Sequence, residues 1–166
     1  MKIFFKIFLP FAMIMVLLLL FDIIFGDIVK IRIKTGLPIS IFTKIDYFDH
    51  IEGEFAVDGY EYGILYLKEK QTQKLIKKVK ESNKWRDDDF DEWLKTKIER
   101  YAKEEDTTGI RNVENGYWFF RNIRSNATDI YNYDNYIANL NDAIPAFIVA
   151  VLDTDNNILY YYELIG

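Results

Sequence analysis

The chain has 166 residues, of which 50% are hydrophobic and 17% aromatic; this composition supports one folded domain and excludes general disorder. The formal net charge of -5 argues against nucleic acid as a partner. The absence of cysteine excludes disulfides, thiol nucleophiles and thiolate metal ligands. Frequent Ile, Lys, Asn and Tyr are typical of an AT-rich genome, and we expect a bacterial protein.

An apolar segment is the first predicted element. It runs from Ile7 to Phe25, nineteen residues with a single charge at Asp22. At about 1.5 Å per residue, a helix of this length nearly spans a hydrocarbon core of roughly 30 Å. Lys2 and Lys6 precede it, and no small-x-small cleavage site follows it. We therefore expect residues 1–26 to be an uncleaved transmembrane helix with the lipid bilayer as its partner; a cleaved signal peptide is the alternative.

The basic residues beside this segment bear on the side of the membrane that the domain occupies. Two lysines precede the segment and three basic residues follow it, so the positive-inside rule slightly favours a cytoplasmic domain. A short tail, one apolar helix and a long domain is also the organisation of tethered secreted domains. We expect a single-pass protein with an extracytoplasmic domain.

Residues 27–46 are expected to connect the anchor to the domain. Val29, Ile31 and Ile33 alternate with basic residues, which predicts a short strand or an extended linker on the membrane surface. A single globular domain is then expected over residues 47–166.

A β-hairpin is predicted at the beginning of this domain. Asp58-Gly59 is a dipeptide that accepts the positive φ angles of a tight turn, and β-rich runs flank it. We expect Ile51 to Val57 to pair with Tyr60 to Leu67.

Two amphipathic helices are predicted next. In QTQKLIKKVKES, residues 71–82, the apolar residues Leu75, Ile76 and Val79 form one stripe. In DDDFDEWLKTKIERYAK, residues 87–103, Asp89 with Glu92 forms an acidic variant of the capping box. The apolar positions of this second helix recur every three or four residues, at Phe90, Trp93, Leu94, Ile98, Tyr101 and Ala102.

The two helices carry opposite charge. Residues 68–84 hold seven lysines against two glutamates, whereas residues 86–106 hold five basic and nine acidic residues. The lysines are suited to an anionic surface such as lipid or wall polymer. We prefer the interpretation that they form a solvated face neutralised by the neighbouring acidic helix.

Strands are predicted again in the last third. Arg111 to Glu114 and the run after Asn115-Gly116 predict a hairpin. Ala146 to Asp153 is continuously apolar, as expected of a central strand, and a second hairpin leads into ILYYYELIG, residues 158–166. Its connection, Asp153 to Asn157, lacks the glycine and glutamate of a calcium loop and predicts an Asx-rich turn.

Candidate catalytic groups gather around His50, the single histidine. Asp49, Glu52 and Glu54 lie near it, and in an extended segment His50, Glu52 and Glu54 share the face that metal or acid-base chemistry needs. Charged residues at a hairpin edge are ordinary surface, and the chain contains no G-x-S-x-G, P-loop or H-E-x-x-H motif. We expect no catalytic residue, cofactor or metal; a membrane-tethered, hydrolase-like enzyme using these carboxylates is the alternative.

The segment SNATDIYNYDNYIANLND, residues 125–142, is rich in Asn, Asp and Tyr. Aromatic rings beside amide groups occur in adaptable binding surfaces. The residues expected to contact a partner are Tyr131, Asn132, Tyr133, Asn135 and Tyr136. The structural alternative, which we prefer, is an irregular excursion or a poor helix that buries the stripe Ile130, Tyr133, Ile137 and Leu140.

The order of elements predicts the α+β class: an N-terminal transmembrane helix, then a small antiparallel sheet with about two helices packed on one face. We expect the domain to be a binding module at the cell envelope, with a protein or another envelope component as its partner.

Overall fold

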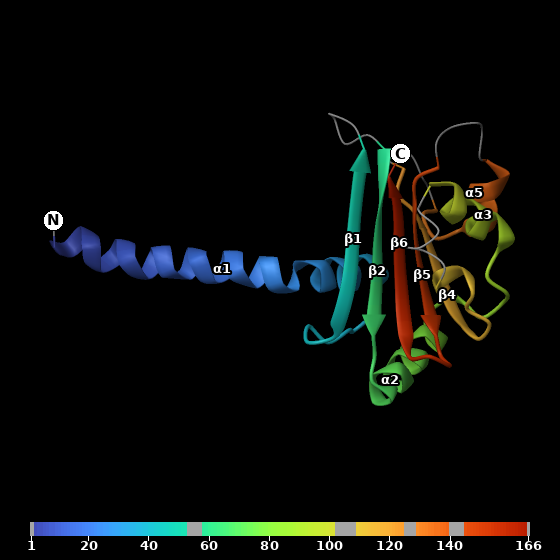
Figure 1. The fold of residues 1–166 in the computed structure, drawn as a ribbon, viewed down its shortest axis with the longest axis horizontal. Helices are drawn as coiled ribbons and strands as arrows, with labels where there is room; N and C mark the ends of the chain where they lie inside the picture. Colours follow the sequence, from blue (N-terminus) through green and yellow to red (C-terminus); the bar gives the residue numbers. More distant parts are fainter. Residues whose placement is uncertain (1, 53–57, 102–108, 125–128, 140–144, 166) are drawn as a thin grey trace.

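The computed structural model describes the chain except residues 1, 53–57, 102–108, 125–128, 140–144 and 166, and of residues 2–9, 48–52, 58 and 101 it describes the backbone alone (Figure 1). The elements in chain order are α1 (Lys2–Thr35), β1 (Lys44–Glu52), β2 (Asp58–Tyr66), α2 (Glu69–Lys80), β3 (Trp85–Arg86), α3 (Glu92–Tyr101), β4 (Gly116–Asn122), α5 (Tyr133–Ala138), β5 (Phe147–Asp153) and β6 (Ile158–Ile165).

The strands of the described residues form one antiparallel sheet in the order β1-β2-β6-β5-β4-β3, which confirms the α+β class. β5 lies between β6 and β4 with every residue buried, as predicted for a central strand. The predicted hairpin joins β5 to β6 through an Asx turn. There, Oδ1 of Asp153 accepts hydrogen bonds from the backbone N–H groups of Asp155 and Asn156 at 3.0 and 2.9 Å.

The first hairpin has its connection earlier in the sequence than predicted. β1 pairs with β2 from Lys44 opposite Tyr66 to Glu52 opposite Asp58, so the connection falls in residues 53–57, outside the described residues. Asp58 and Gly59 begin β2 and do not form the turn. A turn at these two residues would have left the first half of β1 without strand partners for its backbone groups.

The prediction for the partner of β4 is also wrong. Arg111 is helical, and β4 pairs instead with β5 and with the two residues of β3. Gly116 is required by close approach, because a Cβ atom there would lie 2.2 Å from the carbonyl oxygen of Leu152 on β5. The Asn115-Gly116 dipeptide therefore marks a tight contact between strands and not a hairpin turn.

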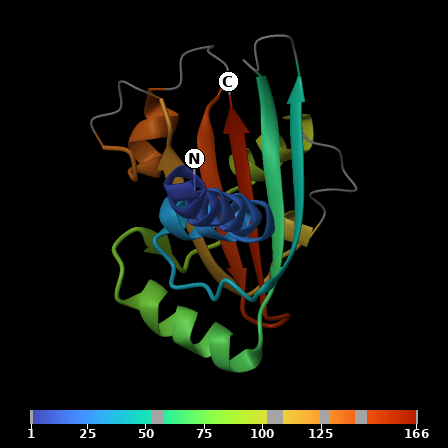
Figure 2. The same cartoon turned by 90° about the vertical axis from the view of Figure 1, so that its left-hand side faces the viewer.

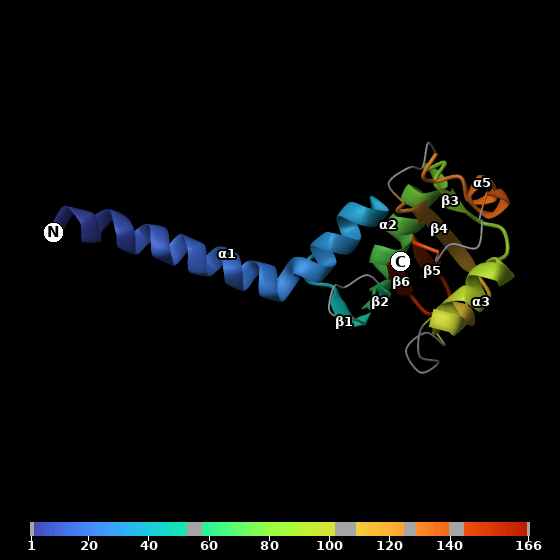
Figure 3. The same ribbon diagram turned by 90° about the horizontal axis from the view of Figure 1, so that it is seen from above.

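Helices cover both faces of the sheet, whereas the two soluble helices were predicted on one face (Figure 3). One face packs against α3 and α5 through a core that includes Phe90, Leu94, Ile98, Tyr133, Tyr136, Trp118, Phe120 and Val149. The other packs against α2 and the end of α1 through Ile28, Ile31, Leu75, Val79, Phe119, Ile148 and Ala150. Since consecutive strand residues such as Phe119 and Phe120 are both buried, each face of the sheet needs its own cover.

Helix α1 extends through the segment that was predicted as a strand or linker. It is helical to Thr35, with Ile28 and Ile31 buried against the sheet and Ile33 exposed. Residues three apart lie on one helix face, so this pattern also fits a helix, and packing against the sheet decides between the two. Figure 3 shows that α1 changes direction where it reaches the domain.

Both predicted soluble helices are present, but α3 begins later than its predicted cap. Oδ1 of Asp91 accepts hydrogen bonds from the backbone N–H groups of Trp93 and Leu94, at 2.8 and 3.2 Å. Asp91 is therefore the residue that caps the helix, and Asp89 lies too early in the chain to reach these groups. Leu94 and Ile98 are fully buried as predicted, while Ala102 lies outside the described residues.

Candidate functional site

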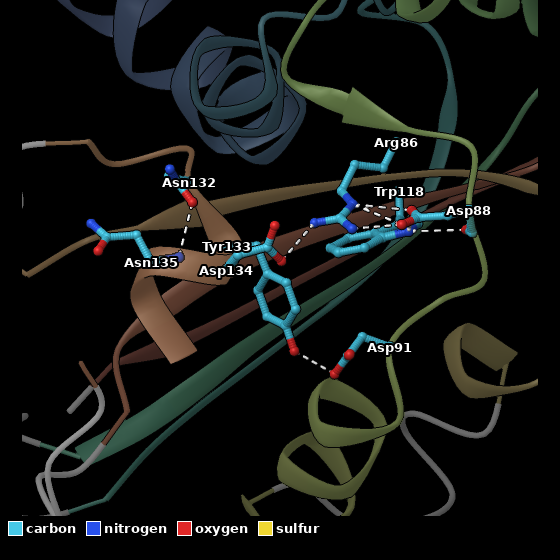
Figure 4. A network of polar contacts seen from close by, with 8 residues as sticks. All are labelled: Arg86, Asp88, Asp91, Trp118, Asn132, Tyr133, Asp134 and Asn135. Carbon is cyan, nitrogen blue, oxygen red and sulfur yellow. Dashed lines mark hydrogen bonds and ion pairs between the residues drawn. The ribbon is translucent and has the colours of Figure 1, made fainter. Parts of the chain in front are cut away.

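The predicted binding residues lie on and just before α5, which packs on β4 (Figure 4). The helix begins after Asn132, whose side-chain oxygen accepts a hydrogen bond from the backbone N–H of Asn135 at 2.9 Å. The asparagine-rich composition of this segment thus has a local cause, because Asn is among the best N-cap residues.

A pocket of about 440 Å³ opens beside this helix, and we call it the α5 pocket. It is lined by Asn83, Lys84, Arg86, Phe120, Asp129, Tyr131, Asn132, Tyr133 and Asp134. Two cations, two carboxylates, two amides and three aromatic rings converge there. Such a lining offers apolar contact together with hydrogen-bond donors and acceptors, which suits a polar segment of a partner.

The five predicted binding residues have different positions. Tyr131, Asn132 and Tyr133 line the α5 pocket, with Tyr131 half-buried and Asn132 exposed. Tyr133 and Tyr136 are each only 6% exposed and belong to the core, so their rings have a packing role. The structural alternative expected this of Tyr133 but not of Tyr136. Asn135 is exposed and accepts a hydrogen bond from the side chain of Asn139 at 2.7 Å.

Tyr133 connects the pocket to the start of α3. Its hydroxyl donates a hydrogen bond to Oδ1 of Asp91, the oxygen that caps α3. Burial and this hydrogen bond raise the pKa of Tyr133 well above its ordinary value. The hydroxyl is therefore a fixed donor, and α5 and α3 are joined through one side chain.

Arg86 forms the cationic wall of the α5 pocket and was not identified from the sequence. Its guanidinium stacks on the Trp118 ring at 4.6 Å and donates hydrogen bonds to both carboxylate oxygens of Asp88, at 2.5 to 3.1 Å. Trp118 in turn donates from Nε1 to Oδ1 of Asp88 at 2.9 Å. Hydrogen bonding to Arg86 holds the pKa of Asp88 below its usual value, so the pair stays ionised. A further contact joins Arg86 to Asp134 at 3.4 Å.

Asp88, which binds Arg86 of the α5 pocket, also lies in the wall of a larger, acidic cleft of about 1300 Å³. Its acidic lining residues are Asp87, Asp88, Asp89, Asp91, Glu92 and Glu114. Within the described residues, no three His, Cys, Asp or Glu side chains are grouped so that they could hold a metal ion.

The alternative catalytic cluster is described only in its backbone. Asp49, His50 and Glu52 belong to β1, with His50 opposite Tyr60, while Glu54 lies outside the described residues.

A second group of functional side chains, also missed by sequence reasoning, lies where α1 meets the sheet. Glu61 on β2 and Glu163 on β6 are directly opposite each other, and each residue is only 5% exposed. Lys30 pairs with Glu61, and Lys34 pairs with Glu163 and lies 3.9 Å from Glu61. We call these four residues, with Tyr47 and Tyr161, the helix-sheet cluster.

The two tyrosines complete the hydrogen bonding of the buried carboxylates. Tyr47 donates to Glu61 at 2.7 Å, and Tyr161 donates to Glu163. Burial opposes the charge of Glu61, but hydrogen bonds from Lys30 and Tyr47 outweigh it, so the pKa of Glu61 is lowered. Burial and the nearby carboxylates raise the pKa of both tyrosines. Two lysines thus pair with two buried carboxylates where α1 meets the sheet.

Comparison of the chain with protein-family models, with curated proteins and with solved structures finds no match. The fold and the two groups of side chains define an α+β domain continuous with a long apolar helix.

Proposed function

We propose that the chain is a single-pass membrane protein of a bacterial envelope, whose α+β domain is a binding module held at the membrane surface by α1. The partner is a protein or another envelope component that contacts the α5 pocket, and the domain lies outside the cytoplasm.

The observation that carries this proposal is the change of environment along one continuous helix. Residues 13–24 of α1 are exposed and apolar apart from Asp22, whereas Ile28 and Ile31 are buried in the domain. Within the described residues, α1 is the one helix long and apolar enough to cross a membrane, by length and composition. An exposed apolar surface of this extent requires a cover, and the bilayer provides one.

The connection between helix and domain supports a structural role for the whole of α1. A cleavable leader has no need to pack in the core of the domain that it precedes. Here the segment after the apolar run contributes two buried isoleucines and two lysines that pair with buried glutamates. The membrane segment and the domain therefore form one unit.

The α5 pocket supports the binding role because its polar groups are fixed before any partner arrives. Arg86 is held by Asp88 and Trp118, and Asn132 is held as the cap of α5. Fixed side chains lose little conformational entropy on association.

A pull-down from detergent extract tests the proposal. We expect the full chain to retain a stoichiometric partner, and Lys84→Ala with Asp134→Ala, both exposed at the rim of the pocket, to reduce its recovery several-fold. The control is Lys95→Ala with Glu92→Ala, which removes an exposed ion pair of the same charges from α3. Equal recovery from both double variants would remove the α5 pocket as the binding surface.

The orientation is tested separately. External protease on intact cells should digest an extracytoplasmic domain, and digestion only after lysis would place the domain inside.

A further inference from the structure

The lysines of α2 form one continuous exposed face. Thr72, Leu75 and Val79 are buried against the sheet. The opposite side of the helix presents Lys70, Lys74, Lys77 and Lys78, all exposed, and we call it the lysine face. Spacings of three and four residues place these side chains along a single stripe. None of the four forms an ion pair with a described residue.

The acidic helix expected to neutralise these lysines lies on the other side of the sheet. Leu94 and Ile98 of α3 belong to the core of one face, and Leu75 and Val79 of α2 belong to the core of the opposite face. The two helices pack on opposite faces of the sheet, and among the described residues no ion pair joins an acidic residue of α3 to the lysine face. Its positive charge is directed away from the domain.

The lysine face and the apolar helix share one side of the molecule. The core that buries Leu75 and Val79 of α2 also buries Ile28 and Ile31 of α1. A hollow of about 240 Å³ is lined by Lys34 from α1 and by Lys78 from α2. Figure 2 looks at the domain from the side on which α1 leaves it, and α2 lies below the end of α1 in this view.

An exposed aromatic ring lies on the same side, next to the end of the apolar run. Phe42 is 81% exposed, and its ring contacts that of Phe25 edge to face at 5.8 Å. Phe25 is the last residue of the apolar segment, so Phe42 lies at the level where the helix passes from lipid to domain. Phe is found on the apolar side of segments that lie at the boundary of headgroups and acyl chains, so the Phe42 ring suits an apolar contact at this depth.

We infer that the lysine face docks on anionic lipid headgroups of the bilayer that α1 crosses, with Phe42 as an apolar contact beside it. This inference rests on the proposed membrane anchoring and adds the lipid class that the domain recognises. Because α1 holds the domain at the membrane, the lysine face of α2 is held near the headgroups. The attraction between lysines and anionic headgroups acts over a Debye length of about 8 Å. Anionic lipid thereby fixes the orientation of the domain relative to the membrane.

The test is chemical labelling of lysines in the full chain reconstituted into nanodiscs. One set contains phosphatidylcholine alone, and the other contains equal parts of phosphatidylcholine and phosphatidylglycerol. We expect labelling of Lys70, Lys74, Lys77 and Lys78 to slow at least three-fold in the anionic set and to recover in high salt, because the contact is electrostatic. Lys95 and Lys97 on α3 are the internal control and should label equally in both sets.

A variant separates lipid contact from other causes of protection. With Lys70, Lys74 and Lys77 replaced by glutamine, Lys78 should label in anionic nanodiscs at its neutral-bilayer rate. Lys95→Gln with Lys97→Gln should leave the protection of Lys78 unchanged.

The outcomes distinguish this inference from the proposed function. A chain that enters both kinds of nanodisc but shows equal labelling overturns the lysine face as a lipid contact and leaves the anchor intact. A chain that does not elute with nanodiscs at all overturns both.

Discussion

Glu61 and Glu163 are charged residues in a buried environment. Each is nearly inaccessible, yet each is paired with a lysine of α1. A buried carboxylate is tolerated only when charges and hydrogen bonds replace its water, and the tyrosines supply the remaining donors. These residues give the junction of helix and sheet one specific geometry.

Removing one of these charges should therefore destabilise the fold. Glu61→Gln keeps the shape but weakens the hydrogen bonds from Lys30 and Tyr47, and we expect a loss of about 2 to 3 kcal/mol in unfolding free energy. The measurement is a urea melt of the full chain in detergent, followed by tryptophan fluorescence. Glu81→Gln, the same change at an exposed position, should cost less than about 0.5 kcal/mol. Equal effects of the two would show that the buried pair contributes nothing.

The same residue makes stability depend on pH. The pKa of Glu61 is lower in the folded chain than the ordinary value of about 4.3. Its stabilising contribution is thus complete above the unfolded pKa and is lost as the pH falls through the folded pKa. We expect the difference between wild type and Glu61→Gln to be constant above about pH 5.5 and to shrink below about pH 4.5. A difference that grows on acidification would contradict the sign of this pKa shift.

Among the helices and strands, the start of α3 has two candidate capping residues, Asp89 and Asp91, which the sequence does not distinguish. Asp91 caps the helix and accepts from Tyr133, whereas Asp89 is exposed in the preceding loop. Asp91→Ala should cost about 1 to 2 kcal/mol in the same urea melt, and Asp89→Ala less than about 0.5 kcal/mol. The reverse order would restore Asp89 as the capping residue.

The packing of α3 on the sheet can be tested with the same urea melt. Leu94 is fully buried, so Leu94→Ala should cost about 2 to 5 kcal/mol. Lys97 lies over the ring of Trp93 at 5.3 Å and is only partly exposed, so Lys97→Ala should cost no more than about 1 kcal/mol. Small and equal losses would mean that α3 does not pack on the sheet.

For the whole molecule, local patterns in the sequence predicted the positions of helices and strands better than they predicted which strands pair and on which face of the sheet each helix packs. The continuous apolar run at Phe147–Asp153 identified the central strand, and the stripe of Leu75 and Val79 identified α2. The face on which α2 packs depends on the whole sheet, and no local spacing encodes it. The alternation at Val29 to Lys34 fits two kinds of element, and only the buried surface offered by the sheet selects the helix.

The charged residues of the α5 pocket and of the helix-sheet cluster also gave only weak, local signals in the sequence. Lys30 and Lys34 are one helical turn apart, and Glu163 interrupts an otherwise apolar strand face, yet their pairing joins residues far apart in the sequence. Arg86 precedes three aspartates, and which of them it binds depends on the position of Trp118. The tyrosines of residues 131–136 were identified as a group, but the structure gives them different places: Tyr131 lines the pocket, Tyr136 belongs to the core, and Tyr133 takes part in both.

We expect α1 to remain attached to the domain and to hold it at a membrane. The intact mass of the expressed 166-residue chain, measured after carbonate washing of the membranes, tests this. We predict a membrane-bound species with the full mass of 19.8 kDa, less at most the initiator methionine. A soluble species beginning near Asp27 would show the opposite, because the apolar helix would then be a leader that the mature domain does not keep.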